Sequence, residues 1–193
     1  APGGGLTLTG ALAVDGGTIK LDGNYPVGTD NVALGNTALD SIEAGGINNV
    51  AIGDNAGTAI TTGDCNTAVG KDSLCKTTTG IQNTAMGLRS LRSNTTGENN
   101  VAIGAYALDA HVSGSCSVAV GASSLELNTA SNNTAVGGRS MTFNTTGTGN
   151  VAVGKSALTA NTTANNNTAV GYFALTANTT GNCNTAVGAS AAG

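Results

Sequence analysis

Residues 99–108 read Asn-Asn-Val-Ala-Ile-Gly-Ala-Tyr-Ala-Leu, and this stretch contains the pattern that decides the fold. Its centre is an asparagine followed by a β-branched residue, an alanine, an aliphatic residue and a glycine. The same five-residue unit recurs ten times along the chain, once with Ser117 in place of the asparagine. Of the nine intervals between its glycines, one is 18 residues, one is 16 and the other seven are 17. The glycines of the unit are Gly35, Gly53, Gly70, Gly87, Gly104, Gly121, Gly137, Gly154, Gly171 and Gly188. A fixed period of this length indicates a repeat architecture in which each unit packs on its neighbours.

Two further features complete each unit. A large aliphatic residue follows the glycine by four positions in most units, and Asn-Thr-Thr-Gly turn clusters close the units at 94–97, 144–147 and 178–181. Glycine, asparagine and β-branched residues are poor helix formers and are typical of turns and short strands. We therefore predict an all-β fold: a parallel β-solenoid, or β-roll, of about ten 17-residue coils over residues 31–193, stacked at about 4.8 Å per coil. Residues 1–30 alternate apolar and polar side chains in places and are predicted to form a β-rich lead-in or cap.

Three columns of residues are the candidate functional positions, and all three are interpreted as structural. The asparagines that open the units are expected to form a ladder of side-chain amides; they include Asn66, Asn83, Asn100, Asn133, Asn150, Asn167 and Asn184. The aliphatic residues after the glycines are expected to form the core of the coil; they include Leu74, Leu91, Leu108, Leu125, Leu158 and Leu175.

The alanines at the centre of the units form the third column. In an extended Thr67-Ala68-Val69 segment the alanine points away from the face shared by its neighbours. We expect this alanine side to pack closely against other copies of the chain, because each unit has too few large aliphatic residues for a lone core. The column includes Ala68, Ala85, Ala102, Ala119, Ala135, Ala152, Ala169 and Ala186. Cyclic symmetry would close such a contact, so the chain is predicted to be a homo-oligomer.

Composition limits the function classes. Charged residues make up 9% of the chain and aromatic residues 3%, and there is no tryptophan. Seven lysines and arginines, scattered singly in a chain of net charge −4, argue against nucleic-acid binding. No run of 18 apolar residues exists, so insertion into a membrane is not expected. The positive hydropathy and low charge also argue against disorder.

The sequence has few residues that could form a catalytic or metal-binding site. The single histidine, His111, takes the place of a turn asparagine and is expected to be an exposed loop substitution. Asp109 and Glu126 are about one coil apart, without an aromatic platform for a carbohydrate-active enzyme. Acidic residues near the first coils, such as Asp54, are interpreted as solvated loop charges rather than as a calcium site. We predict no catalytic residues, no cofactor and no metal.

The repeat register limits which of the four cysteines could form disulfides. Cys65, Cys116 and Cys183 share one column but lie three and four coils apart, at least ~14 Å along the axis, which is too far for a disulfide. A bond between Cys65 and Cys75 stays open. No Cys/His spacing typical of zinc sites is present.

Units such as Asn99–Gly104 followed by Ala107 and Leu108 resemble the head repeat of trimeric autotransporter adhesins, the YadA-like left-handed parallel β-roll. The resemblance covers about residues 31–193 and implies a homotrimer, display at a cell surface and attachment to a host or matrix. Residues 16–29, running into the unit at 31–35, resemble the segment that precedes such repeats in fibre and appendage proteins of tailed phages.

Together these resemblances imply a non-enzymatic structural fibre or appendage that projects from a phage virion and contacts the host surface. The alternative is the head of a bacterial trimeric autotransporter adhesin. The implied partners are further copies of the chain, other structural proteins of the virion or cell surface, and a host surface glycan or protein. The implied location is the virion surface or the extracellular cell surface. An ice-binding solenoid is a third class, although adjacent threonines such as Thr95 and Thr96 would project to opposite sides and would not form a flat array.

Overall fold

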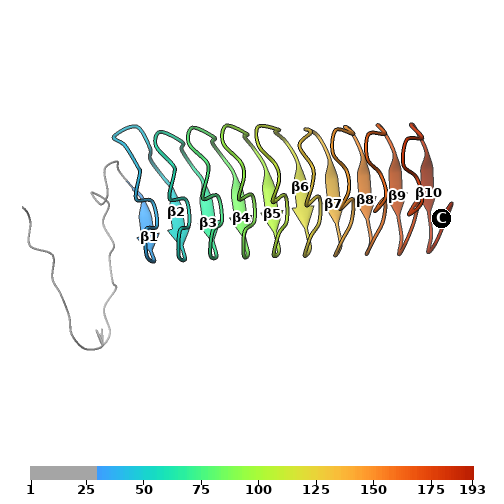
Figure 1. Ribbon diagram of the computed structural model, residues 1–193, viewed down its shortest axis with the longest axis horizontal. Helices are drawn as coiled ribbons and strands as arrows, with labels where there is room; N and C mark the ends of the chain where they lie inside the picture. The colour runs from blue at the N-terminus through green and yellow to red at the C-terminus, as the bar shows by residue number, and fades with distance from the viewer. Residues whose placement is uncertain (1–29) are drawn as a thin grey trace, which may run out of the picture.

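The computed structural model describes residues 30–193, and these residues form a stack of coils along one long axis (Figure 1). Each coil contributes one short strand. The strands are β1 (Val32–Leu34), β2 (Val50–Ile52), β3 (Thr67–Val69), β4 (Thr84–Met86), β5 (Val101–Ile103), β6 (Val118–Val120), β7 (Thr134–Val136), β8 (Val151–Val153), β9 (Thr168–Val170) and β10 (Thr185–Val187). They pair in parallel, in sequence order from β1 to β10, as one sheet. The prediction of an all-β parallel solenoid of about ten 17-residue coils is confirmed.

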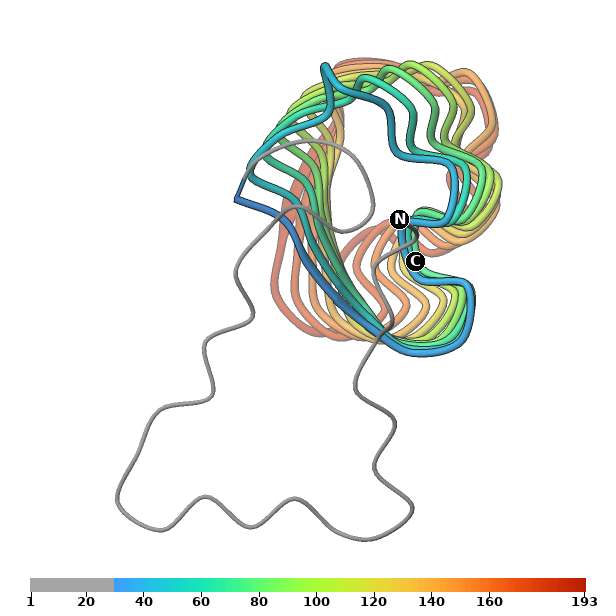
Figure 2. The ribbon, with the colours of Figure 1, turned by 90° about the vertical axis from the view of Figure 1, so that its left-hand side faces the viewer.

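The register of the sheet follows the repeat. Ala85 of β4 pairs with Ala102 of β5, and Ala102 pairs with Ala119 of β6, so equivalent residues lie over one another. Hydrogen bonds between neighbouring coils continue outside the strands, for example from Leu108 N–H to the Ser124 carbonyl at 3.1 Å. Figure 2, which looks along the stack, shows that the coils follow nearly the same outline. The backbone of each coil is therefore hydrogen-bonded to the next coil around much of its perimeter.

Left-handed backbone conformations bend the chain into a closed coil. In the coil that contains β5, Tyr106 has φ 60°, Leu108 φ 53° and Cys116 φ 58°. Non-glycine residues rarely adopt this region. Gly104, which follows β5, has φ 130°, and a Cβ there would lie 2.6 Å from the Gly121 carbonyl carbon. The glycine of the repeat is thus required both by its dihedral angle and by the close approach of the next coil.

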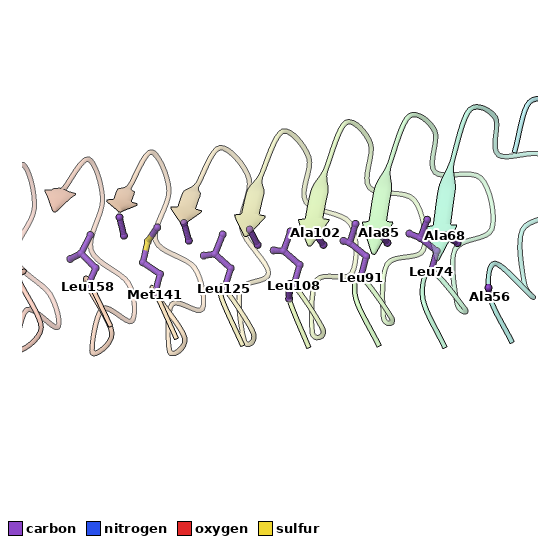
Figure 3. Close-up of a cluster of buried hydrophobic side chains, with 14 of the residues drawn as sticks. Ala56, Ala68, Leu74, Ala85, Leu91, Ala102, Leu108, Leu125, Met141 and Leu158 are labelled. Carbon is purple, nitrogen blue, oxygen red and sulfur yellow. The ribbon is translucent and has the colours of Figure 1, made fainter. Parts of the chain in front are cut away.

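The core lies inside each coil, between the strand and the corner opposite it. The predicted core leucines are buried, and Leu108 and Leu125 have no exposed surface. Burying a leucine side chain stabilises a fold by about 1.5–3 kcal/mol, so one such residue per coil is the main apolar contribution of that coil. Figure 3 shows the leucines in a row beside the alanines of the strands.

The alanine column has a different place from the one predicted. Its side chains are buried within their own chain and pack in the same cluster as the leucines, so they face the interior of the coil and not a neighbouring subunit. This correction applies to Ala68, Ala85, Ala102, Ala119, Ala135, Ala152, Ala169 and Ala186. The physical reason is space: the coil is narrow, and only a methyl group fits on the strand opposite a leucine. The close packing is present, but it occurs inside the chain.

The predicted lead-in or cap falls on residues outside the described range, except for Asp30, which is exposed. Within residues 30–193 no helix has the length and apolar character needed to cross a membrane.

Candidate functional site

The asparagines that open the coils form a buried ladder. In one step of it, Asn83 Oδ1 accepts the backbone N–H of Asn100 at 3.0 Å and its side-chain amide at 3.2 Å. The Asn100 amide also donates to the Gly114 carbonyl at 2.9 Å, across the same coil. Buried polar groups stabilise a fold only when they are hydrogen-bonded, and these are. The arrangement explains why nine of the ten units open with asparagine: one side chain joins two parts of its own coil and accepts a backbone N–H of the next coil.

The ladder runs through the predicted asparagines and is broken once. Backbone-to-side-chain steps of 2.8–3.0 Å join successive members on both sides of the break. Ser117 replaces asparagine in the sixth coil. Its N–H still donates to Asn100 Oδ1 at 2.9 Å, but its shorter side chain leaves the next step, from Asn133 N–H to Ser117 Oγ, at 3.4 Å. The side chains of the buried members are hydrogen-bonded within the ladder, which supports a structural role for them.

A second buried ladder lies at the Asn-Thr-Thr-Gly turns and was not predicted. Asn161 donates its amide to Asn144 Oδ1 at 2.7 Å, and Asn144 donates to Asn128 Oδ1 at 2.6 Å. Asn144 also donates to the Gly147 carbonyl within its own turn, at 2.9 Å. The signal was in the sequence, because the turn asparagine recurs at the 17-residue period. A turn asparagine by itself indicates only a turn, and its inward direction depends on the coil geometry.

His111 belongs to this second ladder, so the prediction of an exposed loop residue is wrong. Its side chain is fully buried. Nδ1 lies 3.1 Å from the Asn128 carbonyl oxygen, while Nε2 and the neighbouring Asn94 Oδ1 have no hydrogen-bond partner. Burial lowers the pKa of His111, against the opposing effect of backbone carbonyls of Asn128 and Gly114. The register forces the imidazole into the inward position that an amide occupies elsewhere, and the larger ring does not reproduce the amide hydrogen bonds.

The outward side of the sheet carries a continuous apolar column beside a column of valines and threonines. The strand residues on either side of each inward alanine point outward, and the third residue of every strand is aliphatic. We call this column, together with the partly exposed valines and threonines at the first strand position, the aliphatic face. Its third-position members are Leu34, Ile52, Val69, Met86, Ile103, Val120, Val136, Val153, Val170 and Val187.

The aliphatic face is unusually exposed for side chains of this kind. Ile103 is 39% exposed and Met86 43%, although both lie in the middle of the sheet. Ten coils at about 4.8 Å and two columns roughly 7 Å apart give a strip of the order of 45 Å by 10 Å. Contiguous apolar patches of this size commonly mark an interaction surface.

The cysteines are free in the structure. Cys65, Cys116 and Cys183 are exposed and Cys75 is partly buried. The three members of the column are unpaired, as the register predicts, and the bond between Cys65 and Cys75 that the sequence left open is not present. Burial, with a smaller contribution from Asp72, raises the pKa of the Cys75 thiol.

The acidic candidates are engaged in ion pairs or lie apart. Asp109 accepts from Arg92 Nε at 2.9 Å and lies 3.7 Å from Arg89 Nε, so it is part of a salt bridge rather than half of a carboxylate pair with Glu126. Asp54 pairs with Lys71 at 2.9 Å, and this hydrogen bond lowers the pKa of the carboxyl group. Within residues 30–193 no three His, Cys, Asp or Glu side chains gather in a way that could hold a metal ion.

Comparison of the chain with protein-family models, with curated proteins and with solved structures finds no match.

Proposed function

We propose that this chain is a non-enzymatic structural protein, a projecting homotrimeric β-solenoid of a fibre or appendage whose subunits bury the aliphatic face against one another. The observation that carries the proposal is that face, with Ile103 39% exposed in the middle of a ten-stranded sheet. Burial of apolar surface is the dominant favourable term in protein association. A rod that exposes an aliphatic strip along its whole length gains most from packing against another rod in parallel.

Cyclic symmetry suits this surface. When equivalent copies lie side by side with their axes parallel, each coil meets the same coil of its neighbour, and the interface closes. The aliphatic face has two outward columns, one for each of the two neighbours that a chain has in a ring of three or more subunits. The resemblance to YadA-like heads implies the same trimeric state.

A stack of hydrogen-bonded coils suits a projecting part. Each added coil lengthens the rod by about 4.8 Å, and the buried asparagine ladders couple it to the coil before. The resemblance of residues 16–35 to phage fibre segments favours a virion over a bacterial adhesin head. The corner threonines argue against the ice-binding alternative: Thr78 Oγ1 and Thr145 Oγ1 donate to backbone carbonyls of the next coil, at 3.3 and 3.0 Å, and are already used within the fold.

The oligomeric state is tested by multi-angle light scattering on the 18.5-kDa chain. We expect the mass of three chains, and we expect the substitution Ile103→Glu to shift the mass toward one chain, because it places a charge in the buried contact. Thr96→Glu, on an exposed corner away from the aliphatic face, is the matched control and should remain trimeric. A wild-type chain that stays monomeric over the concentration range would overturn the proposal.

The projecting role needs a separate measurement. Antibodies raised against the chain should label appendages of the source particle in electron micrographs. Labelling of bacterial cells instead of particles would favour the adhesin alternative, and labelling of neither would contradict both.

A further inference from the structure

The two positions that follow the glycine of each coil collect most of the bulky cationic and aromatic side chains of the described chain. They form one corner of the solenoid, and six of its residues are named the corner row: Arg89, Tyr106, Arg139, Lys155, Tyr172 and Phe173. Aromatic residues make up only 3% of the protein and charged residues 9%. Most other columns repeat small or aliphatic residues from coil to coil. These two positions vary from coil to coil and hold large cationic or aromatic side chains. The surface at this corner therefore differs in chemistry from the rest of the repeat.

Two pairs of side chains in the corner row contact each other along the axis. The Arg89 guanidinium lies 5.3 Å from the centre of the Tyr106 ring, and Lys155 Nζ lies 6.0 Å from the centre of the Tyr172 ring. In both pairs the cation belongs to one coil and the ring to the next. Phe173 meets Tyr172 edge to face, with ring centres 4.3 Å apart. These contacts align cations and ring faces in the direction of stacking.

The backbone beneath the row is held by the coil-to-coil ladder. Tyr106 N–H donates to the Leu88 carbonyl at 2.9 Å, Arg139 N–H to Ala122 at 2.9 Å and Phe173 N–H to Lys155 at 3.1 Å. The side chains are therefore presented at the spacing of the coils, about 4.8 Å. A partner that binds the row along the axis must itself repeat at short, regular intervals.

The charges of the row differ between its two ends. Arg89 lies near Asp109, at 3.7 Å. Arg139 and Lys155 lie in successive coils and are exposed, and no carboxylate in residues 30–193 lies within ion-pairing distance of either. Tyr172, in the coil after Lys155, is 52% exposed. In a chain of net charge −4 this end of the row is a local site of unbalanced positive charge beside a half-exposed aromatic ring.

We infer that the corner row, centred on Arg139, Lys155 and Tyr172, binds an extended anionic polysaccharide along the solenoid axis. The ring of Tyr172 packs against the C–H face of a sugar, and Arg139 and Lys155 pair with carboxylate or sulfate groups on neighbouring sugars. This inference rests on the proposed function, because a rod that projects from a particle is placed to contact a polysaccharide on a host surface. A trimer carries three copies of the row, which raises the avidity for a surface-bound polymer.

A nucleic acid is also a polyanion with groups that stack on aromatic rings. Its affinity depends on neutralising many phosphates, and each contact adds to the salt dependence. Two unbalanced cations on an acidic chain are too few for this. The polysaccharide is favoured because its charges are sparser and its sugar faces match an exposed tyrosine.

The experiment measures binding of the whole chain to immobilised polysaccharides at about 0.15 M salt, where charges beyond ~8 Å are screened. The probes are polygalacturonate for carboxylates, heparin for sulfates and dextran as the uncharged polymer. We expect binding to at least one anionic polymer and none to dextran. The double substitution Arg139→Gln with Lys155→Gln should weaken binding by about tenfold or more, since it removes two charge-assisted contacts. Lys76→Gln removes an exposed cation outside the row and should leave binding unchanged.

Tyr172→Ala distinguishes a built surface from loose attraction between charges. We expect it to weaken binding by about threefold or more without a change in net charge. Absence of binding to both anionic polymers, an equal loss with Lys76→Gln, or tighter binding to single-stranded DNA than to the polysaccharides would each overturn the inference. Light scattering on the same samples separates the two proposals: a trimer that does not bind contradicts only this inference, and a monomer contradicts the proposed function.

Discussion

Removal of one ladder asparagine, by the substitution Asn83→Ala, should destabilise the solenoid far more than a surface change. The Asn83 amide donates to the Gly97 carbonyl at 2.8 Å and to Asn66 Oδ1 at 3.1 Å. Its oxygen accepts the backbone N–H of Asn100 at 3.0 Å and the Asn100 amide at 3.2 Å. Alanine removes all four interactions and leaves a gap the size of an amide group in a fully buried position.

The loss of stability depends on which hydrogen-bond partners of Asn83 keep another hydrogen bond after the substitution. The Gly97 carbonyl keeps a bond from the Asn94 amide at 3.1 Å, and the Asn100 amide keeps its bond to the Gly114 carbonyl at 2.9 Å. The Asn100 N–H has no other acceptor and is left unpaired. An orphaned buried donor costs about 1–3 kcal/mol, and each lost hydrogen bond about 1 kcal/mol. We expect the free energy of unfolding to fall by about 3 kcal/mol.

The assay is urea unfolding at fixed chain concentration, because association with other copies would also change the apparent stability. Repeat arrays can open in parts, so hydrogen exchange of the native chain should be measured as well. Exchange should rise most in the coils on either side of Asn83. Asn83→Ser should lose less stability, because the hydroxyl of Ser117 already takes this place in one coil, with a longer step of 3.4 Å. Thr96→Ala, on an exposed corner, is the surface control.

The reasoning would be refuted if Asn83→Ala unfolded within about 0.5 kcal/mol of the wild type, the range of ordinary surface substitutions. Unchanged exchange in the neighbouring coils would refute it independently. Either result would mean that the ladder contributes nothing to the coupling between coils.

Three further predictions concern single positions. Burial lowers the folded-state pKa of His111 below its ordinary value of 6.5. The stability that the neutral histidine contributes is therefore full above that pH and is lost as the pH falls through the lowered value. Thermal unfolding between about pH 7.5 and 5 should show this loss, and His111→Asn should make the pH dependence flatter. Gly104→Ala should destabilise the chain by about 2 kcal/mol or more in urea unfolding, because φ 130° and the carbonyl of Gly121 leave no room for a Cβ, whereas Thr96→Ala should be neutral. A thiol reagent should modify the three exposed cysteines rapidly and Cys75 slowly, because burial and a raised pKa reduce its thiolate; equal rates in the native chain would contradict this, and denaturant should make the rates converge.

The architecture was predictable from the sequence because the period is visible in single residues. The glycine after each strand recurs at 17 residues, and only a stack of coils in register satisfies such a repeat. The asparagine ladder and the leucine core followed from the same register. Each depends on a residue type that has one favourable place in a narrow coil: an amide that must be hydrogen-bonded when buried, and a large aliphatic side chain.

Which face of each strand is buried was not predictable in the same way. Alternation shows that Ala102 and Ile103 lie on opposite faces, but it does not say which face is inside. The larger side chain is usually the buried one. Here the left-handed turns carry Leu108 into the same space, and only the alanine methyl fits opposite it. The prediction that the alanine side packs against other copies is therefore wrong, because the alanines line the interior of the coil and the aliphatic residues face outward.

By itself the sequence determined that the chain is a parallel stack of equivalent turns, since a repeating chemistry at constant spacing admits hydrogen bonding between copies of the same segment. Only the tertiary structure decided what each turn shows to solvent and what it hides. It placed His111 in the interior and Ile103 on the surface, and it brought Lys155 beside Tyr172 from one coil to the next. The physical reason is that inward and outward depend on how the corners bend, and those bends include left-handed angles at residues such as Tyr106 and Leu108, whose side chains do not signal them.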